Sequence, residues 1–246
     1  MKIVLNISYL GTNYAGFQVQ PNAMTVQQRL QDAVESVFGY RCPLTGCSRT
    51  ESGVHAGMMV CAIDTADAPN SPPIDKVADA LNHYLPDDIS VHEAKVAPDD
   101  FHPRYGVKSK EYCYVIWNAR AKNPFLSHRA LHWPTPLDEV LMNEAARYFV
   151  GEHDFAAFCA AGSSVTSTVR QIYSASVVRD GDRIIFSVEG NGFLYNMVRI
   201  MVGTLINVSA GKYSPGDILK IIESKSRASA GFTAPPDGLY LHKVNY

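Results

Sequence analysis

The stretch Gly46-Cys47-Ser48-Arg49-Thr50-Glu51-Ser52-Gly53-Val54-His55-Ala56 gathers an arginine, a carboxylate and a histidine among small residues. Apolar runs flank it at 42–44 and 58–63, so the pattern predicts a polar loop that joins two strands. Rigid scaffolds commonly place functional side chains on such loops. The alternative is a polar hairpin loop with Ser52-Gly53 as its turn. The rest of the chain has to distinguish a functional loop from a plain turn.

The bulk composition predicts a folded protein of one or two domains. The chain has 246 residues, of which 46% are apolar and 19% charged, and its net charge is −2. That charge neither indicates nor excludes a nucleic-acid partner, since local fields matter more than the sum. Five cysteines without a CxxC pair predict free thiols in a reducing compartment. The N-terminus resembles a strand rather than a signal peptide, and no apolar run is long enough for a membrane span. We therefore expect a cytoplasmic protein that does not associate with membranes.

Strand and helix patterns are interspersed along the chain. The expected strands cover 2–9, the run up to 64, 89–96, 107–117, 171–178, 183–189 and 239–244, and the expected helices begin near 25, 73, 136, 191 and 215. Short turns join several strand pairs, which favours an α+β fold with a mixed or antiparallel sheet. The order of elements suggests two similar halves. We expect 1–105 to carry the polar loop and 106–246 to carry a buried helix with an arginine.

That arginine is Arg199, in the middle of the almost wholly apolar segment 191–208. A helix that is apolar all round is expected to be buried. A buried arginine needs an anionic partner, because an unpaired buried charge is strongly destabilising. Glu51 and Glu189 are the candidate partners. The alternative is a surface arginine whose aliphatic stem lies along a half-buried helix.

Six segments resemble, in order, the signature segments of the TruA-type tRNA pseudouridine synthases. They are GTNYAGFQ (11–18), RTESGVHA (49–56), DFHPRY (100–105), KEYCY (110–114), GFLYNMVR (192–199) and TAPPDGLYL (233–241). The resemblance implies the pseudouridine synthase fold, a central mixed, largely antiparallel sheet made of two similar α/β halves with a basic cleft. It also implies a homodimer that binds tRNA and isomerises uridine to pseudouridine in the anticodon stem-loop (family positions 38, 39 and 40). No cofactor and no metal are implied.

The same resemblance implies roles for particular residues. Glu51 matches the catalytic carboxylate, Tyr112 the tyrosine that packs on the target base, and Arg199 the basic residue paired with the carboxylate. Arg49 matches the arginine that helps to fill the space left by the flipped base. The remaining expected substrate-binding residues are Thr50, His55, Arg104, Lys108 and Lys110, of which the last three are candidates for phosphate contacts because they lie in a basic cluster.

The chain departs from the family at Glu51, where the family has aspartate. One extra methylene moves the carboxylate by about an ångström, and a misplacement of that size costs on the order of a hundredfold in rate. We therefore expect activity to be reduced or lost, and a catalytically inactive tRNA-binding member of the fold is the alternative. For Tyr112 the alternative is strand packing, and we expect only one of Tyr112 and Tyr114 to face the site.

Two other classes of function fit less well. A hydrolase could use Ser48, Ser52 or Cys47 with His55, but no nucleophile elbow is present. The eight histidines are scattered, without the HExxH or paired helical spacing of a metal site.

Overall fold

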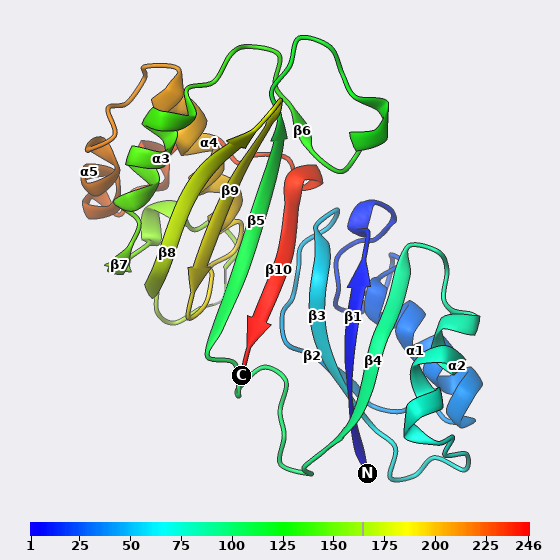
Figure 1. Ribbon diagram of the computed structural model, residues 1–246. Coiled ribbons are helices and arrows are strands. Elements are labelled where there is room, and N and C mark those ends of the chain that lie inside the picture. The colour runs from blue at the N-terminus through cyan, green and yellow to red at the C-terminus, as the bar shows by residue number, and fades with distance from the viewer. Residues whose placement is uncertain (164) are drawn as a thin grey trace. The chain divides into compact units, whose positions relative to one another are not determined.

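The computed structural model describes residues 1–163 and 165–246 and divides them into two compact units (Figure 1). The first comprises Met1–Lys108 with Leu241–Tyr246, and the second comprises Ser109–Tyr240. The sequence led us to expect halves of 1–105 and 106–246, and that division stays a prediction. Within the described residues, no helix has both the length and the apolar character that crossing a membrane requires.

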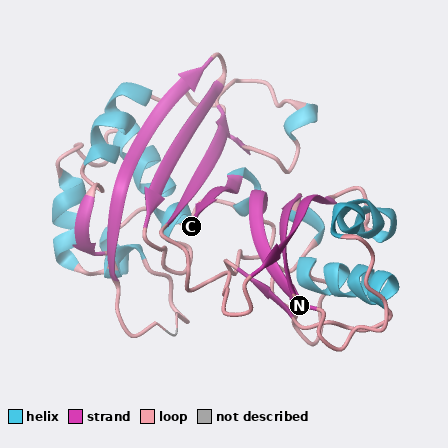
Figure 2. Cartoon of the chain, turned by 60° about the horizontal axis from the view of Figure 1, so that its bottom comes forward, coloured by secondary structure: helices cyan, strands magenta, loops and turns pink. Residues whose placement is uncertain are grey.

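The first unit is built on antiparallel strands with helices on one side (Figure 2). Its strands are β1 (Lys2–Tyr9), β2 (Leu44–Gly46), β3 (His55–Asp64) and β4 (Ile89–Ala97). β1 lies between β4 and β3, and β2 pairs with β3. Helices α1 (Val26–Phe38) and α2 (Ile74–Tyr84) complete the unit. Alternate residues of β1 are buried, as the period of two predicts.

The start of α1 follows the sequence prediction, and local signals account for both of its ends. The Thr25 side chain accepts a hydrogen bond from the backbone N–H of Gln28 at 3.3 Å and so caps the first turn. Gly39 ends the helix in the left-handed conformation with φ of 69°. The apolar stripe that begins at Val26 and ends at Phe38 is buried.

The second unit contains β5 (Ser109–Trp117), β6 (Leu131–His132), β7 (Gly151–Asp154), β8 (Val169–Asp180) and β9 (Arg183–Gly190). Its strand order is β5-β9-β8-β7, and all these pairs are antiparallel, whereas β6 pairs with β5 in parallel. The helices are α3 (Glu139–Arg147), α4 (Met197–Ser209) and α5 (Asp217–Ser224), and β10 (Leu239–Asn245) returns the chain to the first unit. The prediction of an α+β fold with mixed, largely antiparallel strands is confirmed.

Several expected element boundaries are wrong. α4 begins at Met197 rather than at residue 191, because Asn196 adopts a left-handed conformation with φ of 59°. α3 begins at Glu139 rather than at Pro136, because the Asp138 side chain accepts hydrogen bonds from the backbone N–H groups of Val140 and Leu141 and so caps the helix. The short strand β7 was not expected. α4 is buried as predicted, but Arg199 itself is only half-buried, so the prediction of a buried arginine is wrong.

Candidate active site

Glu51 lies in a turn between β2 and β3 whose backbone is fixed by the segment 11–18. The N–H of Phe17 donates to the carbonyl of Thr50 at 3.1 Å, and the N–H of Gly53 donates to the carbonyl of Tyr14 at 3.2 Å. Gly11 lies so close to the loop that a Cβ there would be 2.0 Å from the carbonyl oxygen of Val54. Two of the six signature segments therefore form a single packed structure around Glu51.

Buried hydrogen bonds support the same turn from the interior of the first unit. The hydroxyls of Tyr9 and Thr50 lie 2.7 Å apart, and Nδ1 of His55 accepts a hydrogen bond from the backbone N–H of Gly11 at 2.9 Å. His55 is completely buried and Thr50 almost so. Because Nδ1 accepts a hydrogen bond, it carries no proton. The expected RNA contacts of these two residues stay a prediction, and their burial favours a supporting role.

Glu51 itself is half-buried, and Arg49 beside it is exposed. Arg49 and Arg104 line one cavity of about 160 Å³. The other lining residues include Gln18, Thr45 and Ser48, and no acidic residue is among them. Two arginines that line one cavity without a carboxylate make an environment suited to an anion such as a phosphate.

The turn that carries Arg104 is held by aromatic packing and hydrogen bonds. Nδ1 of His102 accepts from the backbone N–H groups of Arg104 and Tyr105 at 3.1 and 3.3 Å. The rings of His102 and Tyr105 stack with centroids 4.2 Å apart. The Tyr246 hydroxyl donates to the carbonyl of Pro103 at 2.7 Å. The position of Arg104 is thus set by contacts within its turn and by one tertiary hydrogen bond, rather than by a helix or strand.

In the second unit, β5 directs Tyr112 to a buried position. Its ring meets that of Phe193 edge-on, with centroids 5.0 Å apart. Tyr114 is also buried on this face, so the expectation that only one of the two could face the site is wrong: residues two apart on a strand share a face. The Tyr114 hydroxyl donates to the carbonyl of Pro235 at 2.7 Å. Burial raises the pKa of Tyr114, which keeps it protonated.

Arg199 is held by two acceptors in its own unit. Its Nε donates to the carbonyl of Ala234 at 2.7 Å, and its Nη1 donates to Oδ1 of Asn196 at 2.7 Å. Glu189, the second candidate partner, accepts a hydrogen bond from the Ser109 hydroxyl at 2.6 Å. Glu51 belongs to the first unit and Arg199 to the second, so their pairing stays a prediction.

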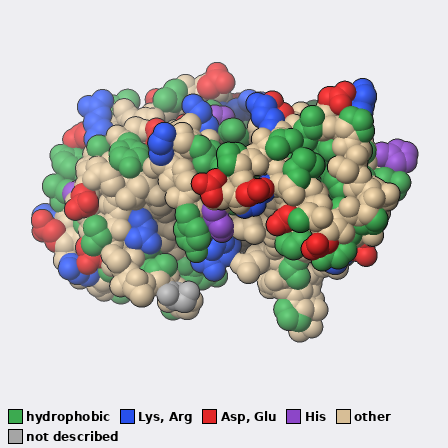
Figure 3. Space-filling model, turned by 90° about the horizontal axis from the view of Figure 1, so that it is seen from below, with side chains coloured by type: hydrophobic (Ala, Val, Ile, Leu, Met, Phe, Trp, Pro, Cys, Tyr) green, Lys and Arg blue, Asp and Glu red, His purple; other side chains and the backbone are tan. Residues whose placement is uncertain are grey.

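Lys108 and Lys110, the two lysines expected to contact RNA, lie on either side of the point in the sequence where the first unit gives way to the second. Lys108 is exposed, and its Nζ donates to the backbone oxygen of Tyr246 at 3.0 Å. Lys110 is the second residue of β5 and is half-buried. On the face drawn in Figure 3, Lys and Arg side chains are interspersed with Asp and Glu. Their role in RNA binding stays a prediction.

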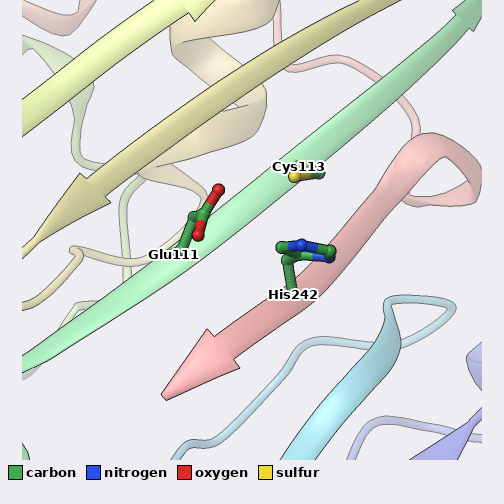
Figure 4. Close-up of side chains that lie close together, drawn as sticks. All are labelled: Glu111, Cys113 and His242. Carbon is green, nitrogen blue, oxygen red and sulfur yellow. The ribbon is translucent and has the colours of Figure 1, made fainter. Parts of the chain in front are cut away.

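Glu111 and Cys113 alternate with Tyr112 and therefore project from the other face of β5, whereas His242 projects from β10 (Figure 4). Since His242 belongs to the first unit and the other two to the second, we do not assign them a metal site. Cys113 Sγ lies 3.3 Å from the Ser187 hydroxyl. The five cysteines are thiols rather than disulfides, in line with the sequence.

The sequence reasoning missed three residues of these arrangements: Tyr9, Asn196 and Ala234. Asn196 had a signal, because asparagine is common immediately before a helix. Tyr9 ends a strand, and the contribution of Ala234 comes from its backbone, so neither is distinguished by residue type.

Comparisons with known proteins agree with the six segments. A family model described as tRNA pseudouridine synthase matches residues 6–106 and 145–246. A protein named tRNA pseudouridine synthase A from Thermoanaerobacter sp. (strain X514) is 46% identical over 244 residues, covering 99% of each chain. A protein of the same name from Ruminiclostridium cellulolyticum is 46% identical over 247 residues, covering 100% of this chain and 99% of the relative. One from Geotalea uraniireducens is 44% identical over 245 residues, with 100% and 99% covered.

A structural comparison adds little. A chain in the crystal structure of a Cbf5-Nop10-Gar1 complex aligns with 97% of this chain and 57% of its own length, at 12% identity and a TM-score of 0.35. That similarity is too low to support an argument. The family model and the relatives at over 40% identity are decisive, and on them the chain belongs to the TruA-type tRNA pseudouridine synthases.

Proposed function

We propose that this chain modifies the anticodon stem-loop of tRNA, at family positions 38, 39 and 40, with Glu51 as its catalytic carboxylate. As a member of its family, the chain is an isomerase that converts uridine to pseudouridine in tRNA. The observation that carries the assignment to Glu51 is the turn itself. Its carboxylate projects from a backbone that residues 11–18 hold in place by hydrogen bonds.

The reaction breaks the glycosidic bond between N1 and C1′, turns the uracil and joins C5 to C1′. The C5 proton is lost and N1 gains one, so the product is an isomer of the substrate. We assign Glu51 to the sugar or base at the reacting centre, where a carboxylate can act as a nucleophile or proton acceptor. Arg199 would keep this carboxylate ionised, because a nearby cation favours the charged form.

The target base has to leave its stack before it can react, at a cost of a few kcal/mol. We propose that Tyr112 packs on the extruded base, as aromatic side chains commonly do with single-stranded RNA. Its fixed ring contact with Phe193 supports this role, because a tyrosine that is already ordered loses little conformational entropy on binding. Arg49 would help to fill the space that the base leaves.

Arg49 and Arg104 are proposed to contact RNA phosphates at the cavity they share, with Lys108 and Lys110 nearby in sequence. Phosphate contacts set the position of a protein on RNA and make its affinity depend on salt. We further propose a homodimer that acts in the cytoplasm. Five cysteines that are thiols rather than disulfides support a reducing compartment.

The experiment is to map pseudouridine in an unmodified tRNA transcript after incubation with the protein, by carbodiimide labelling and primer extension. We expect stops that correspond to positions 38, 39 and 40 and no others. Transcripts with cytidine at these positions serve as the substrate control. Glu51→Gln serves as the protein control, since it keeps the size of the side chain and removes its charge.

Glu51 also favours a second function, a tRNA-binding protein without turnover. This alternative predicts that tRNA binds tightly while no pseudouridine forms over long incubation. Pseudouridine only outside the anticodon arm would contradict the proposed sites while leaving the family's reaction intact.

A further inference from the structure

Asn196, immediately before α4, combines two unusual local features. Its φ of 59° is left-handed, a conformation that few residues other than glycine adopt. Asparagine at this position normally caps the helix by accepting from a backbone N–H, yet its side chain makes no capping bond. Its Oδ1 instead accepts a hydrogen bond from Nη1 of Arg199 at 2.7 Å. The side chain is therefore directed to the guanidinium rather than to the end of the helix.

Arg199 lies in the first turn of α4, which is an unfavourable place for a cation. The helix dipole puts partial positive charge at this end, and the first turn contains no acidic residue to offset it. Asparagine adopts the left-handed conformation more readily than most residues, whereas the cation at 199 opposes the preference of this helix end. Such a conflict is typical of functional sites, where the surrounding structure enforces it.

The guanidinium is fixed at two points. Nη1 is held by Asn196, and Nε is held by the carbonyl of Ala234 at 2.7 Å. The N–H of Ala234 in turn donates to the carbonyl of Arg199 at 3.1 Å. Two hydrogen bonds to a planar group set both its position and the direction of its plane, and a guanidinium has further N–H groups with which it can bind an anion. The single hydrogen bond from Arg199 Nε to the carbonyl of Ala234 would still let the guanidinium plane rotate about that bond.

We propose that Asn196 is a positioning residue, which holds the guanidinium of Arg199 in the orientation that the reaction uses. The inference rests on the proposed catalytic role of Arg199. Asn196 does not need to touch RNA for this role. Its contribution is to order the arginine before the substrate arrives, so that less side-chain freedom is lost in the transition state.

The test is the Asn196→Gly variant, because glycine adopts the left-handed conformation easily and removes only the side chain. We expect kcat for a tRNA transcript to fall by about tenfold, with KM changed by less than about twofold. The melting temperature should not fall. Lys225→Gly is the matched control, since Lys225 has a similar φ of 52° at the end of α5. Its kcat should equal that of the wild type.

A double-mutant cycle with Arg199→Lys separates positioning from a general structural effect. If Asn196 acts through Arg199, Asn196→Gly should lower kcat by less than about twofold when residue 199 is lysine. Equal losses in both backgrounds would overturn the proposal. So would a kcat for Asn196→Gly equal to that of the wild type.

NMR of protein labelled with ¹⁵N-arginine gives a readout that does not need turnover. In the wild type we expect separate Nη signals for Arg199, because the bond to Asn196 slows rotation of the guanidinium. Asn196→Gly should merge them, and Arg199→Lys assigns the signal. A wild type that forms no pseudouridine would contradict the proposed function, whereas unchanged rotation in Asn196→Gly would contradict this inference.

Discussion

Glu51 occupies a turn with little freedom to adjust. Its neighbour Thr50 is tied through its carbonyl to Phe17 and through its hydroxyl to Tyr9. The N–H of Val54 donates to the carbonyl of Glu51 at 3.2 Å, which closes the turn. A backbone held in this way cannot easily retract to compensate for a longer side chain. The position of the carboxylate therefore depends on the length of the side chain at position 51.

Glu51→Asp should raise the rate of pseudouridine formation, by up to about a hundredfold, because it withdraws the carboxylate by the length of one methylene. The measurement is single-turnover release of tritium from tRNA that carries [5-³H]uridine. tRNA affinity should stay within about twofold, since the charge is unchanged. A wild-type rate equal to that of the aspartate variant would show that the turn already accommodates glutamate.

At the scale of elements, the packing of α4 depends on small residues. A Cβ added at Gly203 would lie 1.9 Å from the carbonyl oxygen of Phe232, and one added at Gly231 would lie 2.5 Å from the backbone of α4. The Thr204 hydroxyl accepts a hydrogen bond from the N–H of Gly231 at 2.9 Å. This close approach anchors the segment that continues to Ala234 and so to Arg199.

Gly203→Ala should destabilise the protein by about 2–3 kcal/mol, because overpacking against fixed backbone outweighs the gain of about 1 kcal/mol in helix propensity. Urea denaturation measures this change in the free energy of unfolding. Gly216→Ala is the control, since a Cβ there meets nothing within 4 Å. We expect it to change stability by less than about 0.5 kcal/mol. A stabilised Gly203→Ala would show that the two segments can separate without cost.

At the scale of the whole molecule, charge is distributed rather than concentrated. The net charge is −2, and several basic side chains are already engaged in ion pairs. Arg41 pairs with Asp32 and Glu35 at 2.8 and 3.0 Å. Arg104 lines the cavity that has no acidic residue among its lining. Binding of an anionic RNA is therefore expected to depend on a few local cations rather than on the overall field.

Arg104→Gln should weaken tRNA binding and reduce the slope of log K against log salt by about 0.7–0.9, the value for one phosphate contact. Filter binding at several salt concentrations measures both quantities. The matched control is Arg41→Gln, since its guanidinium is occupied by two carboxylates on the surface. An unchanged slope for Arg104→Gln would remove Arg104 from the phosphate contacts.

Stability at low pH should depend on the pair of Glu139 and Arg179. The hydrogen bond from Arg179 Nε to Glu139 Oε2, at 2.8 Å, lowers the pKa of the Glu139 carboxyl. A carboxyl whose pKa is lower in the folded state stabilises the protein at pH values above its pKa in the unfolded state, which is about 4.3. This contribution is lost as the pH falls through the pKa of the folded state.

Glu139→Gln should therefore lower the free energy of unfolding by about 0.5 kcal/mol at pH 7, the size typical of a partly exposed pair, and by progressively less as the pH falls through the folded-state pKa of Glu139. Denaturation curves from pH 3 to 7 test this. Glu144→Gln on the same helix is the control, because Glu144 is exposed and forms no salt bridge within the described residues. Equal behaviour of the two variants at all pH values would contradict the assignment.

The sequence by itself determined the class of fold, most of the elements and the family. β1 was predicted with its observed bounds, and the start of α1 near residue 25 was recognised, because these signals act over a few residues. The six segments led to the family, which the family model and the relatives confirm. Glu51, Arg49 and Arg199 were chosen in the same way, and their roles stay proposals.

Only the tertiary structure decided which residues support these side chains. Nothing in the local sequence relates Gly11 to His55, or Ala234 to Arg199, because those contacts join segments that are far apart in the chain. The left-handed Asn196 moved the start of α4 and left Arg199 half-buried, against the prediction. Short-range preferences can be read from neighbouring residues, whereas the burial and orientation of a side chain depend on what packs against it.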